Sequence, residues 1–275
     1  MDRVEVVPGL EPDVLDRVVT RLRELEPTAV AILVTGSYAR GTADPTSDLD
    51  VRVVTHADPS SEYRMWFEDR RGAKPLHVSP SMLSLERFVD ERDEPAKWRW
   101  ALGFPVLDEM RYVWATEDAR TILGDPPSRV RRPAPPELED FTEFVTKVQR
   151  AAAAGDGAGV RIFAPYAALL APGLLRSLND EFVVRDRRDA LDAALSLAIA
   201  PDHYRDDLAV CLGLVPVGDD AVAEAALRLG RELLAFLREH KPDVDPQPDI
   251  ARYLADGTLE RHLGSQTDAA GPAQP

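Results

Sequence analysis

The stretch TGSYARGTADPTSDLDVRVV, from Thr35 to Val54, decides the fold. It begins where an apolar, β-prone run over 29–35 ends, and it closes with polar and apolar residues in alternation. This order predicts a buried strand over 29–35, a tight turn at Gly36, a short helix over 37–41 and a half-buried strand over 48–55.

The second strand carries charge on one face. Asp48, Asp50 and Arg52 share that face, because successive side chains of a strand point to opposite sides, and the residues between them are apolar. The two carboxylates then project about 7 Å apart, given a rise of ~3.3 Å per residue. They repel each other unless a cation or solvent separates them. Such a pair can hold one divalent cation or bridge two, and magnesium favours one or two carboxylates combined with water and phosphate oxygens.

The turn before this strand suits an anion. Gly36 permits close backbone approach, and the amides that follow Ser37 begin a short helix whose N-terminus favours negative charge. Taken singly, each residue is better explained by an ordinary glycine turn or by solvent-exposed aspartates. Together, a phosphate at Gly36 and Ser37 and a metal at Asp48 and Asp50 describe the two ends of one nucleoside triphosphate.

This combination resembles the nucleotidyltransferase superfamily, which shares its fold with polymerase β. The resemblance rests on Gly36-Ser37 at the end of one strand and on Ser47-Asp48-Leu49-Asp50 at the next strand. The layout also resembles, more weakly, the antibiotic nucleotidyltransferases of the kanamycin and lincosamide type. The resemblance implies a magnesium-dependent enzyme that transfers a nucleoside monophosphate, AMP from ATP or the equivalent from another triphosphate, to a hydroxyl of a small-molecule acceptor. An aminoglycoside-like antibiotic is one such acceptor.

The resemblance also assigns roles to residues. Asp48 and Asp50 would hold two magnesium ions, and the metals would stabilise the attacking and leaving oxygens of an in-line transfer. The implied nucleotide-binding residues are Gly36, Ser37, Arg40 and Ser47.

One position departs from the family pattern. The family places a third carboxylate on a later strand, between apolar residues, and the matching context here is Leu76-His77-Val78. His77 is a poorer magnesium ligand than a carboxylate, although a neutral imidazole can act as a base. One reading makes His77 a general base or substrate contact beside the metals. A second has Glu68, Asp69 or an acid of the helical half, such as Glu143, supply the missing charge.

A third reading removes nucleotidyl transfer altogether. The protein would then be a ligand-binding or regulatory member of the fold, or a biosynthetic enzyme whose metal-independent chemistry uses His77. Metal-dependent nucleotide binding would support the first reading over metal-independent chemistry. Turnover would support the first reading over simple ligand binding.

The wider pattern predicts an α+β protein. A small mixed sheet with flanking helices is expected over 1–125, including a glycine-turn hairpin before His77 and a helix over 81–91. The Pro-rich linker over 126–136 is expected to form neither helix nor strand ladder. A helical bundle over 137–263, with one helix over 162–178, and a disordered tail over 264–275 complete the prediction.

Composition narrows the class of partner. The 275 residues carry a formal net charge of −15, which disfavours binding to long nucleic acid. The single cysteine, Cys211, is expected to be a buried thiol in a reducing compartment. The start of the chain lacks the pattern of a secretory signal, and the apolar run over 167–175 is interrupted by Pro172 and Gly173, so no membrane span and a cytoplasmic location are expected. A homodimer is an expectation from the resemblance alone.

Overall fold

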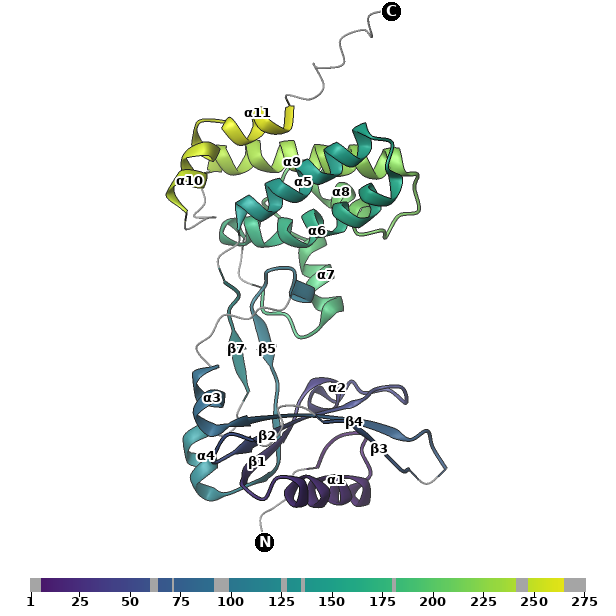
Figure 1. The fold of residues 1–275 in the computed structure, drawn as a ribbon, viewed down its shortest axis with the longest axis vertical. Coiled ribbons are helices and arrows are strands. Elements are labelled where there is room, and N and C mark those ends of the chain that lie inside the picture. The colour runs from purple at the N-terminus through teal and green to yellow at the C-terminus, as the bar shows by residue number, and fades with distance from the viewer. Residues whose placement is uncertain are drawn as a thin grey trace, which may run out of the picture. The chain divides into compact units, whose positions relative to one another are not determined.

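The computed structural model describes residues 6–59, 64–70, 72–91, 99–124, 128–134, 137–179, 182–240 and 247–264. The chain divides into two compact units. Unit 1 comprises residues 1–94 and 107–131, and unit 2 comprises residues 95–106 and 132–275. Figure 1 shows the sheet of the first unit and the helices of the second.

Unit 1 is built on a mixed five-stranded sheet with the order β3-β4-β2-β1-β6. Strands β2 and β4 are parallel, and the other neighbouring pairs are antiparallel. The strands are β1 (Ala29–Val34), β2 (Leu49–Thr55), β3 (Trp66–Glu68), β4 (Leu76–Ser84) and β6 (Arg111–Ala115). The hairpin predicted before His77 is therefore the β3–β4 pair, and its Arg71 lies outside the described residues.

Helix α1 (Pro12–Leu25) covers one face of this sheet (Figure 1). It begins with proline at its first position, where the missing amide hydrogen costs nothing. Its apolar stripe, which includes Val14, Val18 and Leu22, packs with the inner residues of β1, β2 and β4 in one buried cluster. Burial of this face removes Leu49, Val51 and Val53 from water and turns Asp50 and Arg52 to the opposite side, whereas the predicted strand residue Asp48 lies just before β2.

The opposite face is covered by α3 (Leu85–Asp90) and α4 (Glu117–Leu123). Phe88 of α3 and Ala119 of α4 form a smaller core with Leu33, Val54 and Tyr112 of the sheet. Asp50 and Arg52 lie on this same face and are half-buried.

The expected helix over 81–91 begins later than predicted. Strand β4 continues to Ser84, because its parallel pairing with β2 runs through Thr55 and Ser84, and only Leu85–Asp90 is helical. The Ser84 hydroxyl accepts a hydrogen bond from the Arg87 amide and caps the helix. Pairing across the sheet therefore overrides the local helical pattern of the first four residues.

The proline-rich segment also forms a strand, contrary to prediction. Strand β7 (Arg129–Arg131) pairs with β5 (Val106–Asp108) in a two-stranded sheet. The three residues of β7 contain no proline, so every backbone amide in it keeps a hydrogen to donate.

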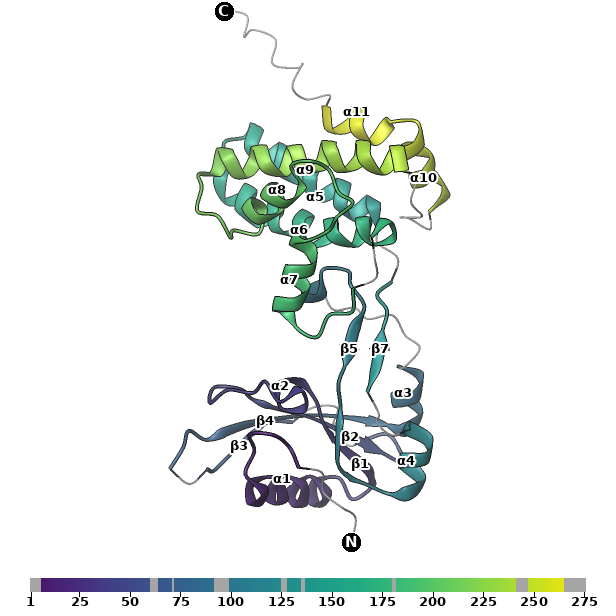
Figure 2. The same cartoon turned by 180° about the vertical axis from the view of Figure 1, so that it is seen from behind.

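Unit 2 is a helical assembly. Its long helices α5 (Leu138–Ala153), α6 (Gly157–Leu175) and α9 (Asp219–His240) pack against one another and bury one large apolar cluster. Figure 2 shows α9 lying along the same layer as α8 (Tyr204–Cys211). The shorter elements are η1 (Arg99–Ala101), η2 (Arg176–Leu178), α7 (Arg187–Leu195), α10 (Pro248–Ala255) and α11 (Thr258–Gly264). Cys211 is buried, and burial raises the pKa of its thiol to about 12, as expected of a packed thiol.

Helix α6 begins before the expected range 162–178 and is not interrupted at Pro172 or Gly173. Asp156 caps its start, and the helix continues through both residues. Gly173 of this helix packs closely against Gly103, since a Cβ added to Gly103 would lie 2.6 Å from the Gly173 Cα. In the part of the chain that the structure describes, 157–178 is the one segment long and apolar enough to cross a membrane, and 56% of that window is buried within the protein, as in a core helix.

The predicted fold class is confirmed: a small mixed α/β sheet unit is followed by a helical C-terminal region. The predicted tail over 264–275 lies outside the described residues, apart from Gly264 at the end of α11.

Candidate active site

The turn after β1 is held directly against β2. The Thr35 amide donates to the Asp50 carbonyl at 3.0 Å, which fixes the end of β1 beside the acidic strand. Gly36 has φ +68°, and a Cβ added there would lie 2.5 Å from Asp50 Oδ2. Glycine is therefore required at this position for two reasons: the backbone is left-handed, and the Asp50 carboxylate leaves no room for a Cβ.

Asp50 is the more enclosed of the two carboxylates. Burial raises its pKa above the ordinary aspartate value, and the negative charge of Asp48 raises it further. The positive charges of Arg40 and Arg52, together with His77, act in the opposite direction. Within the described ranges, no hydrogen bond to the Asp50 carboxylate is found, so its charge is balanced by these neighbours alone.

His77 lies beside Asp48 across the β2–β4 pair. Its Nδ1 is 3.9 Å from Asp48 Oδ2, a separation too long for a hydrogen bond. Nε2 is buried and has no hydrogen-bond partner in the described part of the chain. The imidazole stacks on Phe67 of β3 with ring centroids 5.2 Å apart, while the Phe67 side chain is largely exposed. Nδ1 is thus the nitrogen on the carboxylate side.

The backbone around α2 (Gly36–Arg40) is tightly closed. Gly41 ends the helix in the left-handed conformation, and the Thr42 amide donates to the Ser37 carbonyl at 2.9 Å. Tyr38 and Ala39 are buried in the core beneath α1, which anchors the turn. Arg40 Nε is buried and lacks a hydrogen-bond partner among the described residues.

Ser47 is part of a turn that leads into β2. Its hydroxyl accepts from the Asp44 amide at 2.9 Å, and its own amide donates to the Asp44 carbonyl at 3.0 Å. The Thr46 hydroxyl and amide both donate to the Asp44 carboxylate and lower its pKa. The Ser47 hydroxyl hydrogen remains able to donate to another acceptor.

These side chains fit a divalent cation that is completed by its substrate. No three His, Cys, Asp or Glu side chains gather into a metal-binding group among the described residues. Asp48 immediately precedes β2 and Asp50 lies within it, and burial together with the negative charge of Asp48 raises the pKa of Asp50. Magnesium commonly takes one or two carboxylates and fills its other positions with water and phosphate oxygens. Asp48 and Asp50 therefore fit such an ion, and a closed protein cage is not required.

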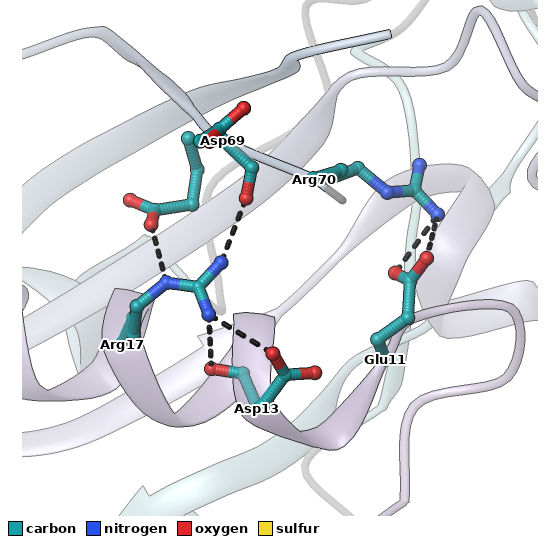
Figure 3. Close-up of polar contacts among 6 residues, drawn as sticks. Glu11, Asp13, Arg17, Asp69 and Arg70 are labelled. Carbon is teal, nitrogen blue, oxygen red and sulfur yellow. Dashed lines mark hydrogen bonds and ion pairs between the residues drawn. The ribbon is translucent and has the colours of Figure 1, made fainter. Parts of the chain in front are cut away.

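The Glu68 carboxylate does not lie at this site. Glu68 accepts hydrogen bonds from Arg17 Nε at 2.8 Å and from Trp66 Nε1 at 3.2 Å, on the face covered by α1. Figure 3 shows Arg17 donating to the Asp69 carbonyl and to Asp13, with Arg70 bound to Glu11 nearby. The prediction that Glu68 supplies the third carboxylate is wrong, because β3 turns it away from Asp48 and Asp50.

Glu143, the other acid considered, belongs to unit 2. Its carboxylate is paired with Lys147 at 2.8 Å and is more than half exposed. It borders a groove of about 300 Å³ between α5 and the α10–α11 region, together with Thr142, Thr146 and Arg150. His203 occupies the N-cap position of α8 and bonds to Glu232 at 2.9 Å on the surface.

Sequence reasoning identified the acidic pair and its turn but missed neighbouring groups. The stacking of Phe67 on His77 follows from the β3–β4 register, which pairs these two residues directly. Arg52 follows the same alternation in the sequence as Asp48 and Asp50, so its place on their strand face could be predicted. Its neighbours Asp108 and Arg129 come from distant strands, and no motif marks them.

Comparison with known proteins supports the superfamily resemblance. Residues 15–97 match the family model described as nucleotidyltransferase domain, and residues 137–239 match the model described as nucleotidyltransferase, substrate binding domain. No curated protein matches the chain. Among solved structures, a nucleotidyltransferase-like protein from Exiguobacterium sibiricum 255-15 is 13% identical and covers 92% of this chain and 91% of its own, with a TM-score of 0.30. The two family matches support a transferase of the nucleotidyltransferase superfamily.

Proposed function

We propose that this protein is a magnesium-dependent nucleotidyltransferase that transfers AMP from ATP to a hydroxyl of a small molecule. The observation that carries the proposal is the close approach of Gly36 to Asp50, with Asp48 two residues earlier in the chain. This approach joins an anion-compatible turn to two carboxylates that repel each other, and a bound metal–triphosphate would neutralise that repulsion.

In this proposal Asp48 and Asp50 hold the metal, which would stabilise charge on the attacking and leaving oxygens when bound. The acceptor oxygen forms a bond to the α-phosphorus, the bond to the bridging oxygen breaks, and pyrophosphate leaves. Gly36, Ser37 and Ser47 bind the phosphate chain through backbone amides and hydroxyls.

His77 is the proposed proton acceptor. Its Nδ1 lies on the Asp48 side, whereas Nε2 is buried, so the acceptor's hydroxyl hydrogen passes to Nδ1. Stacking on Phe67 limits rotation of the imidazole and keeps Nδ1 on that side.

The first test is calorimetric binding of a non-hydrolysable ATP analogue with and without magnesium. Wild type is compared with the double variant Asp48→Asn/Asp50→Asn and with Asp69→Asn, a residue whose backbone carbonyl accepts from Arg17 of α1. We expect magnesium-dependent binding in wild type and Asp69→Asn and its loss in the double variant. Equal binding in all three proteins, or no binding in any, would exclude the proposed site.

The acceptor is proposed to be a small hydroxylated compound, in keeping with the match of residues 137–239 to a model described as nucleotidyltransferase, substrate binding domain. Aminoglycoside-like antibiotics are the first compounds to screen, because a chain with a net charge of −15 favours encounter with cationic molecules. Release of pyrophosphate in the presence of ATP, magnesium and one acceptor identifies the substrate.

A second candidate function rests on His77. If the imidazole replaces a required carboxylate, the protein binds nucleotide or another ligand without transfer. Substitution separates the two: His77→Asp, which restores a carboxylate, raises turnover if the wild-type site lacks an essential ligand, whereas it lowers turnover if His77 is the base.

A further inference from the structure

A second group of charged side chains lies on the same sheet face as Asp50. Arg52 follows Asp50 by two residues on β2 and therefore points to the same side. Its Nη2 is 3.6 Å from Asp108 Oδ2, and its Nη1 is 3.8 Å from Glu91 Oε2. Arg129 Nε lies 4.0 Å from the same Asp108 oxygen. All of these residues belong to unit 1.

None of these separations is a hydrogen bond, because N–H···O bonds fall near 2.7–3.2 Å. The Arg129 side chain is only 10% exposed, yet its Nε and Nη2 have no hydrogen-bond partner within the described residues. Its remaining contact, from Nη1 to the Phe88 carbonyl, measures 3.4 Å. A buried guanidinium with unpaired donors is costly, and Asp108 Oδ2 also lacks a hydrogen-bond partner among the described residues, so this carboxylate does not satisfy the donors around it.

Phe88 orients both guanidinium groups. The Arg129 Cζ lies 4.9 Å and the Arg52 Cζ 5.9 Å from the centre of its ring. Contact through the guanidinium face leaves the N–H edges available to an acceptor in the guanidinium plane. Phe88 thus supports the guanidinium groups of Arg52 and Arg129 and leaves the N–H groups at the edge of each able to donate to an acceptor.

Charges of both signs surround Arg129. Arg52 and the buried Arg131 lie near it together with Asp108 and Glu91, and Arg52 also acts on Asp50. Burial lowers the pKa of Arg129 to about 10; Asp108 opposes this shift, whereas Arg52 and Arg131 add to it. The guanidinium therefore stays charged at neutral pH, while its Nε and Nη2 have no hydrogen-bond partner among the described residues.

We propose that Arg52 and Arg129 form a subsite for an oxyanion, a phosphate or a carboxylate, beside the Asp50 site. Two oxygens of such a group match the paired N–H donors of a guanidinium. The side chains of Arg52 and Glu91 are 17% and 26% exposed, so solvent reaches the group at these two residues, whereas Arg129 Nε and Nη2 are buried. The subsite is independent of the proposed transfer, since it requires neither a metal nor catalysis.

The test is titration of the metal-free full-length protein with inorganic phosphate, followed by calorimetry. We expect saturable binding with a Kd on the order of 1 mM, weakened at least roughly tenfold in Arg129→Gln and in Arg52→Gln. Arg87→Gln is the matched control, because it removes the same charge near Glu91 from a side chain that is half exposed. Absence of saturable binding in wild type, or equal binding in Arg129→Gln, overturns the proposal.

A second measurement does not depend on the variants folding. The side-chain Nε–Hε resonances of Arg52 and Arg129 are followed by NMR in wild type during the same phosphate titration. We expect both to shift in parallel with the calorimetric saturation. A titration in which neither resonance moves overturns the subsite, even where phosphate binds elsewhere, such as near Arg40.

The source of the oxyanion follows from a further titration with the non-hydrolysable ATP analogue and magnesium. If Arg129→Gln weakens analogue binding by about the same factor as phosphate binding, the subsite holds a nucleotide phosphate. If analogue binding is unchanged and phosphate still binds the loaded protein, the subsite holds an acidic group of the acceptor. Failure of the Asp48/Asp50 site alone would leave the phosphate titration of metal-free protein unaffected.

Discussion

At the scale of single residues, Gly36 controls how closely the turn approaches Asp50. Replacement by alanine places a Cβ 2.5 Å from Asp50 Oδ2 and forces a side chain into the left-handed region. We expect Gly36→Ala to lose about 1–2 kcal/mol of stability and also to abolish magnesium-dependent nucleotide binding, because Asp50 must move. Thermal unfolding and calorimetry measure the two effects.

Gly41 provides the matched control for Gly36. It has φ +71°, but a Cβ added there would meet only Pro8, at 3.6 Å. Gly41→Ala is expected to lose a similar amount of stability while keeping nucleotide binding. Equal loss of binding in both variants would mean that backbone strain, and not the contact with Asp50, affects the site.

Asp50 is expected to lower the stability of the metal-free protein at neutral pH. Its pKa is raised in the folded state by burial and by Asp48, so folding favours the neutral carboxyl. Stability is therefore lost as pH rises from the ordinary aspartate pKa through the raised folded value. We expect Asp50→Asn to be more stable than wild type above that window and to lose the advantage below it.

Magnesium supplies the check on this prediction for Asp50. A cation that binds only the folded state stabilises it, so magnesium should raise the unfolding temperature of wild type and not of Asp50→Asn. Unfolding curves recorded across pH with and without magnesium measure both effects. A variant less stable than wild type at neutral pH would contradict the assigned shift.

At the scale of elements, β3 is held to α1 by Glu68. The carboxylate accepts from Arg17 and Trp66 on the face away from Asp48 and Asp50. We expect Glu68→Gln to lose about 1 kcal/mol of stability, since Arg17 is partly exposed, and to leave magnesium and nucleotide binding unchanged. Asp69→Asn should change neither property, because Arg17 bonds to the Asp69 carbonyl.

Calorimetry decides the question for Glu68. Loss of magnesium-dependent binding in Glu68→Gln, with the fold intact, would reinstate it as the third carboxylate.

Local patterns predicted most elements because the apolar spacing is strong there. The stripe of α1 and the alternation of β2 need only their own residues. Two elements depended on a partner instead. Strand β4 runs to Ser84 because β2 lies beside it, and β7 exists because β5 supplies its ladder. Such pairings join residues far apart in the chain, which no local window detects.

At the scale of the whole molecule, unit 2 contains an ion pair between α8 and α9 in which the carboxylate is buried and the Arg228 side chain is 34% exposed. Asp207 is 1% exposed and accepts from Arg228 Nε at 2.9 Å and from Arg228 Nη2. Burial raises the pKa of Asp207, and Arg228 offsets part of that rise. We expect Arg228→Gln to lose about 3 kcal/mol of stability at neutral pH, because a buried carboxylate is left without its cation.

Acid conditions should reduce the cost of Arg228→Gln, since protonation of Asp207 removes the unpaired charge. Denaturant unfolding at neutral and acidic pH measures the difference. Glu224→Gln is the control, because its exposed pairing with Arg228 contributes little. A cost independent of pH would assign the loss to packing.

The sequence by itself determined the α+β class, the sheet unit followed by helices, and the acidic strand with its glycine turn, because each rests on residues close in the chain. Only the tertiary structure decided which face each carboxylate occupies. It set Glu68 against α1, placed His77 beside Asp48, and gathered Arg129 and Asp108 around Arg52. The physical reason is strand order and register, which depend on burial summed over the whole sheet.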